Sequence, residues 1–477
     1  MIWGRQISQS GDEQMRILIA CSWALPNAGG VNTYVNQLTK ALQRAGHTTD
    51  IFSPTPDGLG FRISNKDLYI ERGRLQSLIA DQTHQYMDQH LPGIHPWIKQ
   101  SEIDRYCLEA AIMYFGLAEY DLIHAQDIVS AHAMSRVKPP HTPLVTTIHG
   151  CLAKEVFVEW TEMGLPEQDQ SSPLWRYCSL REYLGATVSD VTITPSQWLK
   201  DILVQEFSVP EHHVVVSPYG IDVDEFQQNM MRVATIPKPT AKKVFMCPAR
   251  FDVVKGHIYL LHALSKLKEE RTDWVCWLVG DGSLRDKLKR AVQELGLTDY
   301  VTFLGKRDDI PELLHQADLI VLPSIQDNQP FAIIEAQVAG KPIITSNAGG
   351  IPEMIKSASN GFVFRSGDSD QLYNLLRSAL ENPAMFLSVA NQAREQGEIY
   401  WSLPALTSRL HELYELARSK HLDQGNEIAP DHDLQNQNTS EGGDGKWSSQ
   451  RRRRLLLRRK RKVRFLKRRR LLRKKQP

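Results

Sequence analysis

Short runs of apolar and β-branched residues alternate with helical patterns along most of the chain. Residues 16–21 have the pattern of a buried strand, and Gly29 and Gly30 follow them. Apolar residues then recur at the spacing of a helix, at Val31, Tyr34, Val35, Leu38 and Leu42. Further strands are expected at 49–53, 121–124, 144–148, 191–194 and 213–217. This alternation predicts βαβ units, in which a parallel sheet is covered by helices.

The same pattern restarts in the second half of the chain. Strands are expected at 244–247, 274–279, 301–304, 319–322, 343–345 and 362–364. Helices are expected at 256–270, 284–295, 309–317, 331–340 and 369–381. The junction at 218–240 contains three prolines and little periodicity, which is typical of a linker. The chain is therefore predicted to be an α/β protein with two doubly wound domains, at 15–218 and 219–403.

The remaining segments lie outside this alternation. Residues 1–14 are interpreted as an N-terminal extension, and 60–118 as a long insertion that is partly helical. A last amphipathic helix is expected at 404–420. The polar composition of 421–450 predicts a disordered linker, which leads to a tail rich in Arg and Lys at 451–477.

The composition is that of a globular protein, which excludes a mainly disordered or fibrous chain. Of 477 residues, 42% are hydrophobic and 23% are charged. No run approaches the ~18 consecutive apolar residues of a membrane-spanning helix, and charged residues interrupt the N-terminus where a signal peptide would lie. The six cysteines include no CxxC pair, so neither a disulfide framework nor a structural zinc site is expected. These features predict a cytoplasmic protein without a bound metal.

The net charge of +2 conceals two regions of opposite sign. The 17 basic residues of 451–477 have no acidic residue among them, so residues 1–450 carry 40 basic and 55 acidic side chains. We expect the tail to bind an anionic membrane surface, which would suit a peripheral membrane protein. The alternatives are non-specific contact with nucleic acid, docking on the acidic body, and no defined role. Specific recognition of nucleic acid is not expected.

Ligands of open α/β sheets bind beyond the carboxyl ends of the strands, so the residues at those ends are candidates for a site. Gly29 and Gly30 open a helix and permit the close approach of an anionic ligand, although a simple tight turn has the same pattern. His149 follows the strand at 144–148 and is either a ligand contact or a structural histidine.

Two further pairs of charged residues follow predicted strands. Arg250 and Lys255 lie beside the start of a helix, where two cations are suited to bind a diphosphate. We favour this interpretation over the alternative that both are solvated surface charges. Asp327 precedes the helix expected at 331–340, and Glu335 lies within it among Ile and Ala residues. A carboxylate in such apolar surroundings needs a partner. The hydroxyls of a ribose would provide one, and a buried ion pair is the alternative.

Together, these segments resemble the retaining glycosyltransferases of the GT4 family, which have the GT-B fold of two Rossmann-like domains facing across a cleft. The resemblance covers residues 15–420 and depends on a set of motifs in the family's order. The motifs are at 16–20, Gly29-Gly30, Pro195-Ser196, 217–222, Arg250 to Gly256, 278–282, 303–305, 318–324, Glu335-Ala336, Gly340 to Pro342, 349–353 and Asn360-Gly361.

The resemblance implies a role for each candidate residue. The N-terminal domain would bind the acceptor, the C-terminal domain would bind a nucleotide-sugar donor, and the helix at 404–420 would pack back on the N-terminal domain. Arg250 and Lys255 would hold the donor diphosphate, and Glu335 would bind the ribose hydroxyls. His149 would lie near the donor sugar and the acceptor. Further donor contacts are implied for Gly29, Gly30, Gly282, Lys306, Arg307, Asn328, Phe331 and Ala332.

Three positions depart from the family pattern. Asp327 stands where the first Glu of the E-x7-E motif is usual, so its side chain is one methylene shorter. Pro330 lies in a loop that is usually rich in glycine, and it has no backbone N–H to donate. Tyr219 replaces the usual Asn before Gly220.

The activity that the resemblance implies is transfer of a sugar, with retention of configuration, from a nucleoside diphosphate-sugar to a glycan or lipid-linked acceptor. UDP-sugars are favoured over GDP-sugars, and neither a metal nor a cofactor is expected. The implied catalytic residues are Asp327, His149, Arg250 and Lys255. A sugar-nucleotide epimerase or glucan phosphorylase is the alternative on the same fold. A non-catalytic sugar-nucleotide-binding protein targeted by its basic tail is a third hypothesis.

Overall fold

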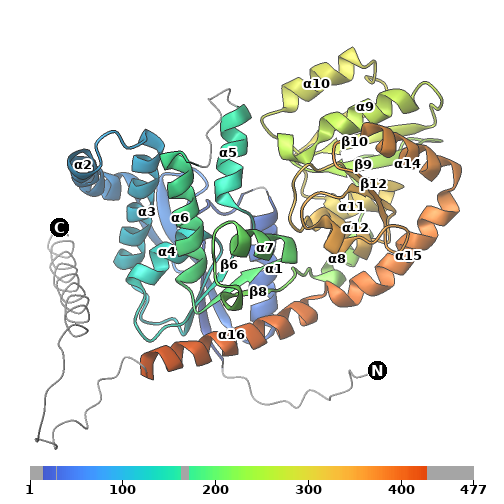
Figure 1. Cartoon of the computed structure of the whole chain (residues 1–477). Helices are drawn as coiled ribbons and strands as arrows, with labels where there is room; N and C mark the ends of the chain where they lie inside the picture. Colours follow the sequence, from blue (N-terminus) through green and yellow to red (C-terminus); the bar gives the residue numbers. More distant parts are fainter. Residues whose placement is uncertain (1–13, 28, 163–170, 427–477) are drawn as a thin grey trace, which may run out of the picture. The chain divides into compact units, whose positions relative to one another are not determined.

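The computed structural model describes residues 14–27, 29–162 and 171–426, which form two helix-covered β-sheets (Figure 1). Most of the predicted extension at 1–14, the linker from residue 427 onward and the tail at 451–477 lie outside the described residues. Among the residues that are described, no helix is long and apolar enough to cross a membrane. All six cysteines are buried free thiols.

Eight strands form the first sheet: β1 (Arg16–Ala20), β2 (Thr48–Pro54), β3 (Gly60–Ser64), β4 (Leu68–Glu71), β5 (Leu122–Ala125), β6 (Leu144–Thr147), β7 (Val191–Thr194) and β8 (Val214–Val216). Their order across the sheet is β4-β3-β2-β1-β5-β6-β7-β8. The accompanying helices are α1 (Gly30–Arg44), α2 (Arg72–His90), α3 (Pro96–Phe115), α4 (Ile128–Val137), α5 (Leu152–Glu162), α6 (Pro173–Thr187) and α7 (Gln197–Gln205). The strands from β1 and β2 through β5 to β8 pair in parallel, as the alternation predicts.

Six parallel strands form the second sheet: β9 (Lys243–Pro248), β10 (Trp274–Val279), β11 (Val301–Gly305), β12 (Leu319–Leu322), β13 (Ile343–Ser346) and β14 (Phe362–Phe364). Their order is β11-β10-β9-β12-β13-β14. The helices are α8 (Val223–Met230), α9 (His257–Leu267), α10 (Arg285–Glu294), α11 (Ile310–Gln316), α12 (Phe331–Val338), α13 (Ile351–Met354), α14 (Ser369–Glu381) and α15 (Pro383–Tyr400), followed by α16 (Leu403–Asn426).

The insertion at 60–118 is more ordered than its sequence suggests. Besides α2 and α3, it contributes β3 and β4, which extend the sheet in the antiparallel sense. Phe61 and Ile63 alternate with polar neighbours, and both are buried. A period of two over five residues is too short to stand out in a segment that is otherwise helical.

The junction at 218–240 was interpreted as a linker without clear periodicity, and the structure places the helix α8 within it. The side chain of Asp222 caps this helix by accepting a hydrogen bond from the backbone N–H of Glu225, at 3.3 Å. Phe226 and Met230, four residues apart, are buried on one face. One capped turn and two buried apolar residues stabilise this helix. Its pattern is too short to be recognised in a sequence segment that also contains three prolines.

The terminal helix α16 extends beyond its predicted end at residue 420. Residues 421–426, which were predicted to begin a disordered linker, are helical. His421 explains the extension: one ring nitrogen lies 3.0 Å from the Asp190 carboxylate and the other 2.7 Å from the Pro140 carbonyl oxygen. Tyr414, further up the helix, is hydrogen-bonded to Nδ1 of His124 on β5 at 2.8 Å. Contacts from α16 to the first sheet thus hold its last turns in place.

Gly185, where α6 crosses α4, tests how tightly the helices cover the first sheet. A methyl group on Gly185 would lie 2.3 Å from Cβ of Ile128 and 2.6 Å from its Cα. We expect Gly185→Ala to lower the free energy of unfolding by roughly 1–3 kcal/mol, because overpacking outweighs the gain in helix propensity. Gly73→Ala in α2, where the same methyl group has only a 3.8 Å contact, is the control. Denaturant titrations that rank the two variants equally would contradict the prediction.

Candidate active site

Each sheet has one point at which its strand order reverses, between β1 and β5 in the first and between β9 and β12 in the second. The connections that leave these neighbouring strands go to opposite faces of the sheet, so a crevice opens beyond their carboxyl ends. Gly29 and Gln126 follow β1 and β5, whereas Arg250, Lys255 and Asp327 follow β9 and β12. Five polar or glycine positions therefore stand at the two places where such folds bind ligands.

An ion pair joins the two connections at the crevice of the second sheet. Nζ of Lys255 lies 2.7 Å from Oδ2 of Asp327, and their side chains are only 19% and 12% exposed. The hydroxyl of Ser324 donates a second hydrogen bond to the same oxygen at 3.0 Å, and the backbone N–H of Asn328 donates to Oδ1 at 3.1 Å. Asp327 is therefore held in one orientation before any ligand arrives.

Glycines allow the connecting segments to approach closely enough for this pair to form. Gly256 has φ +65, and a Cβ there would lie 2.0 Å from the Pro323 carbonyl oxygen. Gly349 has φ +55, and a Cβ there would lie 1.9 Å from the carbonyl oxygen of Asp327. The N–H of Gly350 donates to that same oxygen at 3.0 Å. The start of α9 and the start of α13 thus clamp the loop that carries Asp327.

Glu335 has the environment that its sequence suggests. It lies in α12, flanked by the buried Ile334 and Ala336. Its carboxylate makes no hydrogen bond or ion pair with any residue that the structure describes, and burial alone raises its pKa to about 7. The buried ion pair that was the alternative is therefore absent among these residues. An isolated carboxylate of this kind is able to accept hydrogen bonds from a ligand that supplies hydroxyl groups.

The two cations predicted to bind a diphosphate differ in environment. Arg250 is 59% exposed and pairs with Asp252 at 3.1 Å, and Lys255 is paired with Asp327. Lys255 ends a short 3-10 turn (Val253–Lys255), directly before the first turn of α9. Its ammonium has three N–H donors, of which Asp327 uses one. Lys255 therefore stands beside a helix N-terminus with donor capacity left for an anion, and the exposed guanidinium of Arg250 also has N–H donors left.

The loop before α12 also contacts the first domain. The side-chain N–H of Asn328 donates to the carbonyl oxygen of His149 at 2.9 Å, and its Oδ1 is hydrogen-bonded to the hydroxyl of Ser196. Gln329 donates to the carbonyl oxygen of Pro195 at 3.0 Å and accepts from the backbone N–H of Tyr219 at 2.6 Å. Asn328 was predicted to contact the donor, and here its side chain joins the two domains.

Aromatic side chains fill the space between Gly30 and His149. Phe331, the first residue of α12, stacks on Tyr219 with the ring centres 5.1 Å apart and the planes 7° apart. A Cβ on Gly30 would lie 3.8 Å from Phe331, whereas one on Gly29 would meet nothing within 4 Å. Gly29 and Gly30 are both exposed. The Gly-Gly loop thus lies beside the start of α12 and leaves open space in front of it.

His149 is held at both ring nitrogens. Nδ1 lies 2.6 Å from the hydroxyl oxygen of Tyr219, and Nε2 lies 3.3 Å from Oε1 of Gln126. The ring of Tyr34 meets the imidazole edge-on at 4.9 Å. Burial lowers the pKa of His149 to about 3, so the ring is neutral at physiological pH. It serves as a hydrogen-bonding group and not as a cation.

The other predicted donor contacts have mixed surroundings. Arg307 is committed to a bidentate ion pair with Asp309, while Lys306 is exposed. A Cβ on Gly282 would lie 2.7 Å from a backbone oxygen of Phe251, so backbone packing already requires this glycine. Ala332 is buried in the first turn of α12. Across the described part of the chain, no group of three His, Cys, Asp or Glu side chains is placed to hold a metal ion.

Glu353, the last residue of the 349–353 motif, was given no role from the sequence, and the structure shows that it joins the two domains. Its two carboxylate oxygens accept hydrogen bonds from the backbone N–H groups of Gln197 and Trp198, each at 2.7 Å. These groups begin α7, so an acidic residue of the second domain caps a helix of the first. Ser196, the side-chain cap of the same helix, also touches Asn328. A Ser followed by a helical pattern is a recognisable cap, but the sequence gives no sign of a partner 150 residues away.

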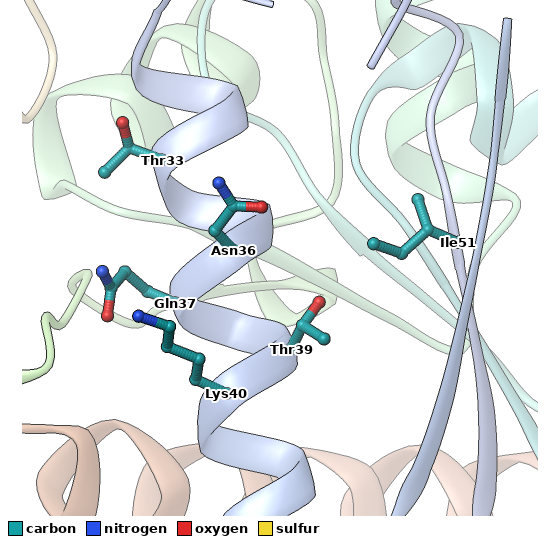
Figure 2. A pocket seen from close by; sticks show the side chains of 6 residues that line it. All are labelled: Thr33, Asn36, Gln37, Thr39, Lys40 and Ile51. Atoms are coloured by element: carbon teal, nitrogen blue, oxygen red, sulfur yellow. The ribbon is translucent and has the colours of Figure 1, made fainter. Parts of the chain in front are cut away.

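A separate groove runs along the polar face of α1 (Figure 2). Its volume is about 350 Å³, and it is lined by Thr33, Asn36, Gln37, Thr39, Lys40 and Ile51. Two lining residues already bind the segment around α8: Gln37 accepts from the backbone N–H of Asp222 at 2.8 Å, and Lys40 pairs with Glu225. No candidate site residue lines this groove, so it is distinct from the crevices.

Two family models match the chain. The one described as Glycosyl transferases group 1 matches residues 233–397, and the one described as Glycosyltransferase Family 4 matches residues 28–225. An uncharacterized glycosyltransferase of Methanocaldococcus jannaschii is 30% identical over 355 residues, which are 71% of this chain and 83% of the relative. The chain belongs to the GT4-type glycosyltransferases. A second relative is the MMP alpha-(1->4)-mannosyltransferase of Mycolicibacterium hassiacum. It is 25% identical to this glycosyltransferase over 84% of this chain and 98% of the relative's length.

Solved structures confirm the predicted GT-B architecture. Anabaena HepE in complex with UDP-glucose aligns with a TM-score of 0.60 and 20% identity, over 84% of this chain and all of that one. At this identity the match establishes the fold of the glycosyltransferase and leaves its donor to be proposed. The predicted family, fold class and transferase activity are thus confirmed.

Titration of Glu335 should be visible in the stability of the glycosyltransferase. Its pKa is about 7 in the folded protein against an ordinary value of 4.5, so unfolding releases a proton between these pH values. The free energy of unfolding should therefore fall as pH rises from 4.5 to 7 and level off above 7.

Glu335→Gln should remove this contribution and stabilise the protein at pH 8 by on the order of 1–3 kcal/mol. The measurement is the difference in free energy of unfolding between wild type and variant at pH 5 and pH 8. Glu182→Gln is the comparison, because Glu182 also has a pKa of about 7 but is fully buried and accepts a hydrogen bond from the N–H of Ala153. A difference for Glu335→Gln that does not change with pH would contradict the raised pKa.

Proposed function

We propose that this glycosyltransferase moves a sugar from a nucleoside diphosphate-sugar to an acceptor hydroxyl with retention of anomeric configuration, in the synthesis of exopolysaccharide, cell-surface glycan or glycolipid. The observation that carries the proposal is Glu335, a partly buried carboxylate without a hydrogen-bond or ion-pair partner among the described residues, on the helix that follows the Lys255–Asp327 pair. An unpaired carboxylate in apolar surroundings carries a desolvation cost, which a ligand that donates hydrogen bonds to it would offset. The vicinal hydroxyls of a ribose have the required donors and spacing.

In this proposal the diphosphate binds at the crevice of the second sheet. Arg250 supplies a planar fork that suits a phosphate, and Lys255 supplies a point charge at the start of α9. Negative charge develops on the diphosphate as the bond to the sugar breaks. Preoriented cations and helix N-termini stabilise that charge without reorganisation, which lowers the barrier. We assign this role to the two side chains without a metal ion.

The sugar and the acceptor are assigned to the space between the crevice and the Gly29-Gly30 loop. Asp327 holds Lys255 on one side of this space, and neutral His149 lies on the other, joined to the same loop through Asn328. Closely apposed domains exclude water and so limit wasteful hydrolysis of the donor. UDP is the favoured nucleotide of the donor, a choice supported by the shared fold with HepE, which has been solved with UDP-glucose.

Donor binding provides the direct test. We expect one member of a panel of UDP-, GDP- and ADP-sugars to bind the wild type in calorimetry and to be slowly hydrolysed. Arg250→Ala should weaken this binding about 10- to 100-fold, the range for a hydrogen bond between charged groups. Glu335→Gln should weaken it as well, although that variant is the more stable protein.

Arg271→Ala is the matched control. Arg271 pairs with Asp273 two residues later, as Arg250 does with Asp252. It precedes β10, however, and so lies at the amino-terminal ends of the strands, opposite to the candidate site. Its loss should leave donor affinity unchanged. Binding of no sugar nucleotide would refute the proposal. Release of a free epimer without transfer, or a requirement for phosphate as acceptor, would favour the epimerase or the phosphorylase.

For the tail at 451–477 we propose an anionic membrane surface as partner, which suits a lipid-linked acceptor. Its 17 basic residues would each contribute ~1 kcal/mol near such a surface. The full chain should co-sediment with phosphatidylglycerol vesicles at low salt, and a chain ending at residue 450 should not. Phosphatidylcholine vesicles are the control. Equal sedimentation of both chains would refute this role, and release of the full chain from vesicles by equimolar RNA would favour nucleic acid.

A further inference from the structure

The groove along α1 begins one turn beyond the Gly29-Gly30 loop. Thr33, which lines its near end, donates to the carbonyl oxygen of Gly29 from its backbone N–H at 3.2 Å and from its hydroxyl at 3.4 Å. The lining residues on the helix continue from Thr33 to Lys40, a stretch about 10 Å long at the rise of an α-helix. The groove therefore leads away from the loop to which the sugar and the acceptor are assigned, and it is long enough for a chain rather than for one ring.

The lining side chains keep hydrogen-bonding groups available for a ligand. Asn36 is exposed, and its amide has no partner among the described residues. Gln37 accepts through its carbonyl oxygen from Asp222, and its NH₂ group has no partner among the same residues. The hydroxyl of Thr39 donates to the carbonyl oxygen of Val35 at 2.7 Å and so keeps its lone pairs. The groove thus presents both donors and acceptors, which is what a ligand rich in hydroxyl groups requires.

Two of the lining side chains are held in place by the segment that opens the second domain. Gln37 is fixed by the 2.8 Å bond from the backbone N–H of Asp222, and Lys40 is fixed by its pair with Glu225 on α8. The two side chains are three residues apart and lie on the same side of the helix, as Figure 2 shows. Polar groups that are already held lose less side-chain freedom when a ligand binds, so this wall of the groove is prepared for one.

The groove is polar without carrying a net charge. Lys40 is the one ionic side chain among the lining residues, and Glu225 neutralises it. Ile51 is the one aliphatic side chain among them, and Figure 2 shows it on β2, pointing toward the helix. An anionic ligand would meet a single cation that is already paired, and a lipid chain would meet mostly polar groups that it leaves without hydrogen bonds. A neutral glycan fits both features, because its hydroxyl groups pair with the amides and hydroxyls while a C–H face packs against Ile51.

We propose that the acceptor is a neutral oligosaccharide, and that the groove along α1 binds the sugars behind the one that carries the reacting hydroxyl. The inference rests on the proposed function and names the class of its acceptor. The terminal sugar lies at the Gly29-Gly30 loop, the second sugar beside Thr33 and Asn36, and the third beside Thr39. The groove volume of about 350 Å³ is within the range of small-ligand sites. The enzyme therefore recognises its acceptor as a chain and not by the terminal sugar alone.

The dependence of transfer on acceptor length provides the test. The full chain is first screened for binding to an array of neutral oligosaccharides of glucose, galactose, mannose, rhamnose and N-acetylhexosamines. For the series that binds, we expect the acceptor KM to fall about fivefold with each sugar added up to the third, the effect of one neutral hydrogen bond per sugar. Asn36→Ala should reduce the ratio of KM between the monosaccharide and the trisaccharide about fivefold, because the amide is lost. Thr39→Val should reduce only the gain that the third sugar brings.

Asn374→Ala is the matched control. Asn374 is an exposed amide within α14, has no partner among the described residues and does not line the groove, so its loss should leave the KM ratio unchanged. Binding to no neutral oligosaccharide on the array, a KM that does not change with acceptor length, or equal effects of Asn36→Ala and Asn374→Ala would each refute the inference. The array needs no donor, so failure of the wild type to bind any sugar nucleotide would refute the proposed function separately.

Discussion

The largely buried ion pair between Lys255 and Asp327 holds the loop on which both halves of the candidate active site depend. It connects the segment after β9 to the segment after β12, and each side chain is less than one-fifth exposed. A pair of this kind adds little net stability, but loss of one partner leaves a buried charge without compensation. The loop is therefore held firmly at Asp327. From that point Asn328 and Gln329 extend to the first domain, and Phe331 begins the helix that carries Glu335.

Much of the fold follows from local sequence patterns, whereas most contacts between the domains do not. The parallel strands are short and apolar, and glycines mark their ends, so their places could be predicted. Candidate ligand-binding residues such as Arg250, His149 and Glu335 could be found because they follow strands or interrupt an apolar helix. Nothing in the sequence indicates what the side chain of Asn328 contacts. Its partners, His149 and Ser196, lie more than 130 residues away, and an amide side chain has no periodicity to reveal them.

Glu335 departs from the rules of a stable core. An apolar residue on this face of α12 would remove a desolvation penalty, and no described residue makes a contact that requires a carboxylate there. The opposite holds for Glu182, whose buried carboxylate accepts a hydrogen bond from the start of α5 and so contributes to the architecture. Two acidic groups with the same raised pKa thus differ in their surroundings: Glu182 is fully buried and has one hydrogen bond to the backbone, whereas Glu335 is partly exposed and has none among the described residues.

The capping of α7 by Glu353 bears on how the two halves come apart. When they separate, the N–H groups of Gln197 and Trp198 exchange a carboxylate for water, and α7 keeps only Ser196 as its cap. Such a contact between a charge and a helix dipole is worth about 1 kcal/mol and is screened by dissolved ions. Any separation of the two domains would therefore cost more free energy at low ionic strength than at high ionic strength, because dissolved salt screens this contact.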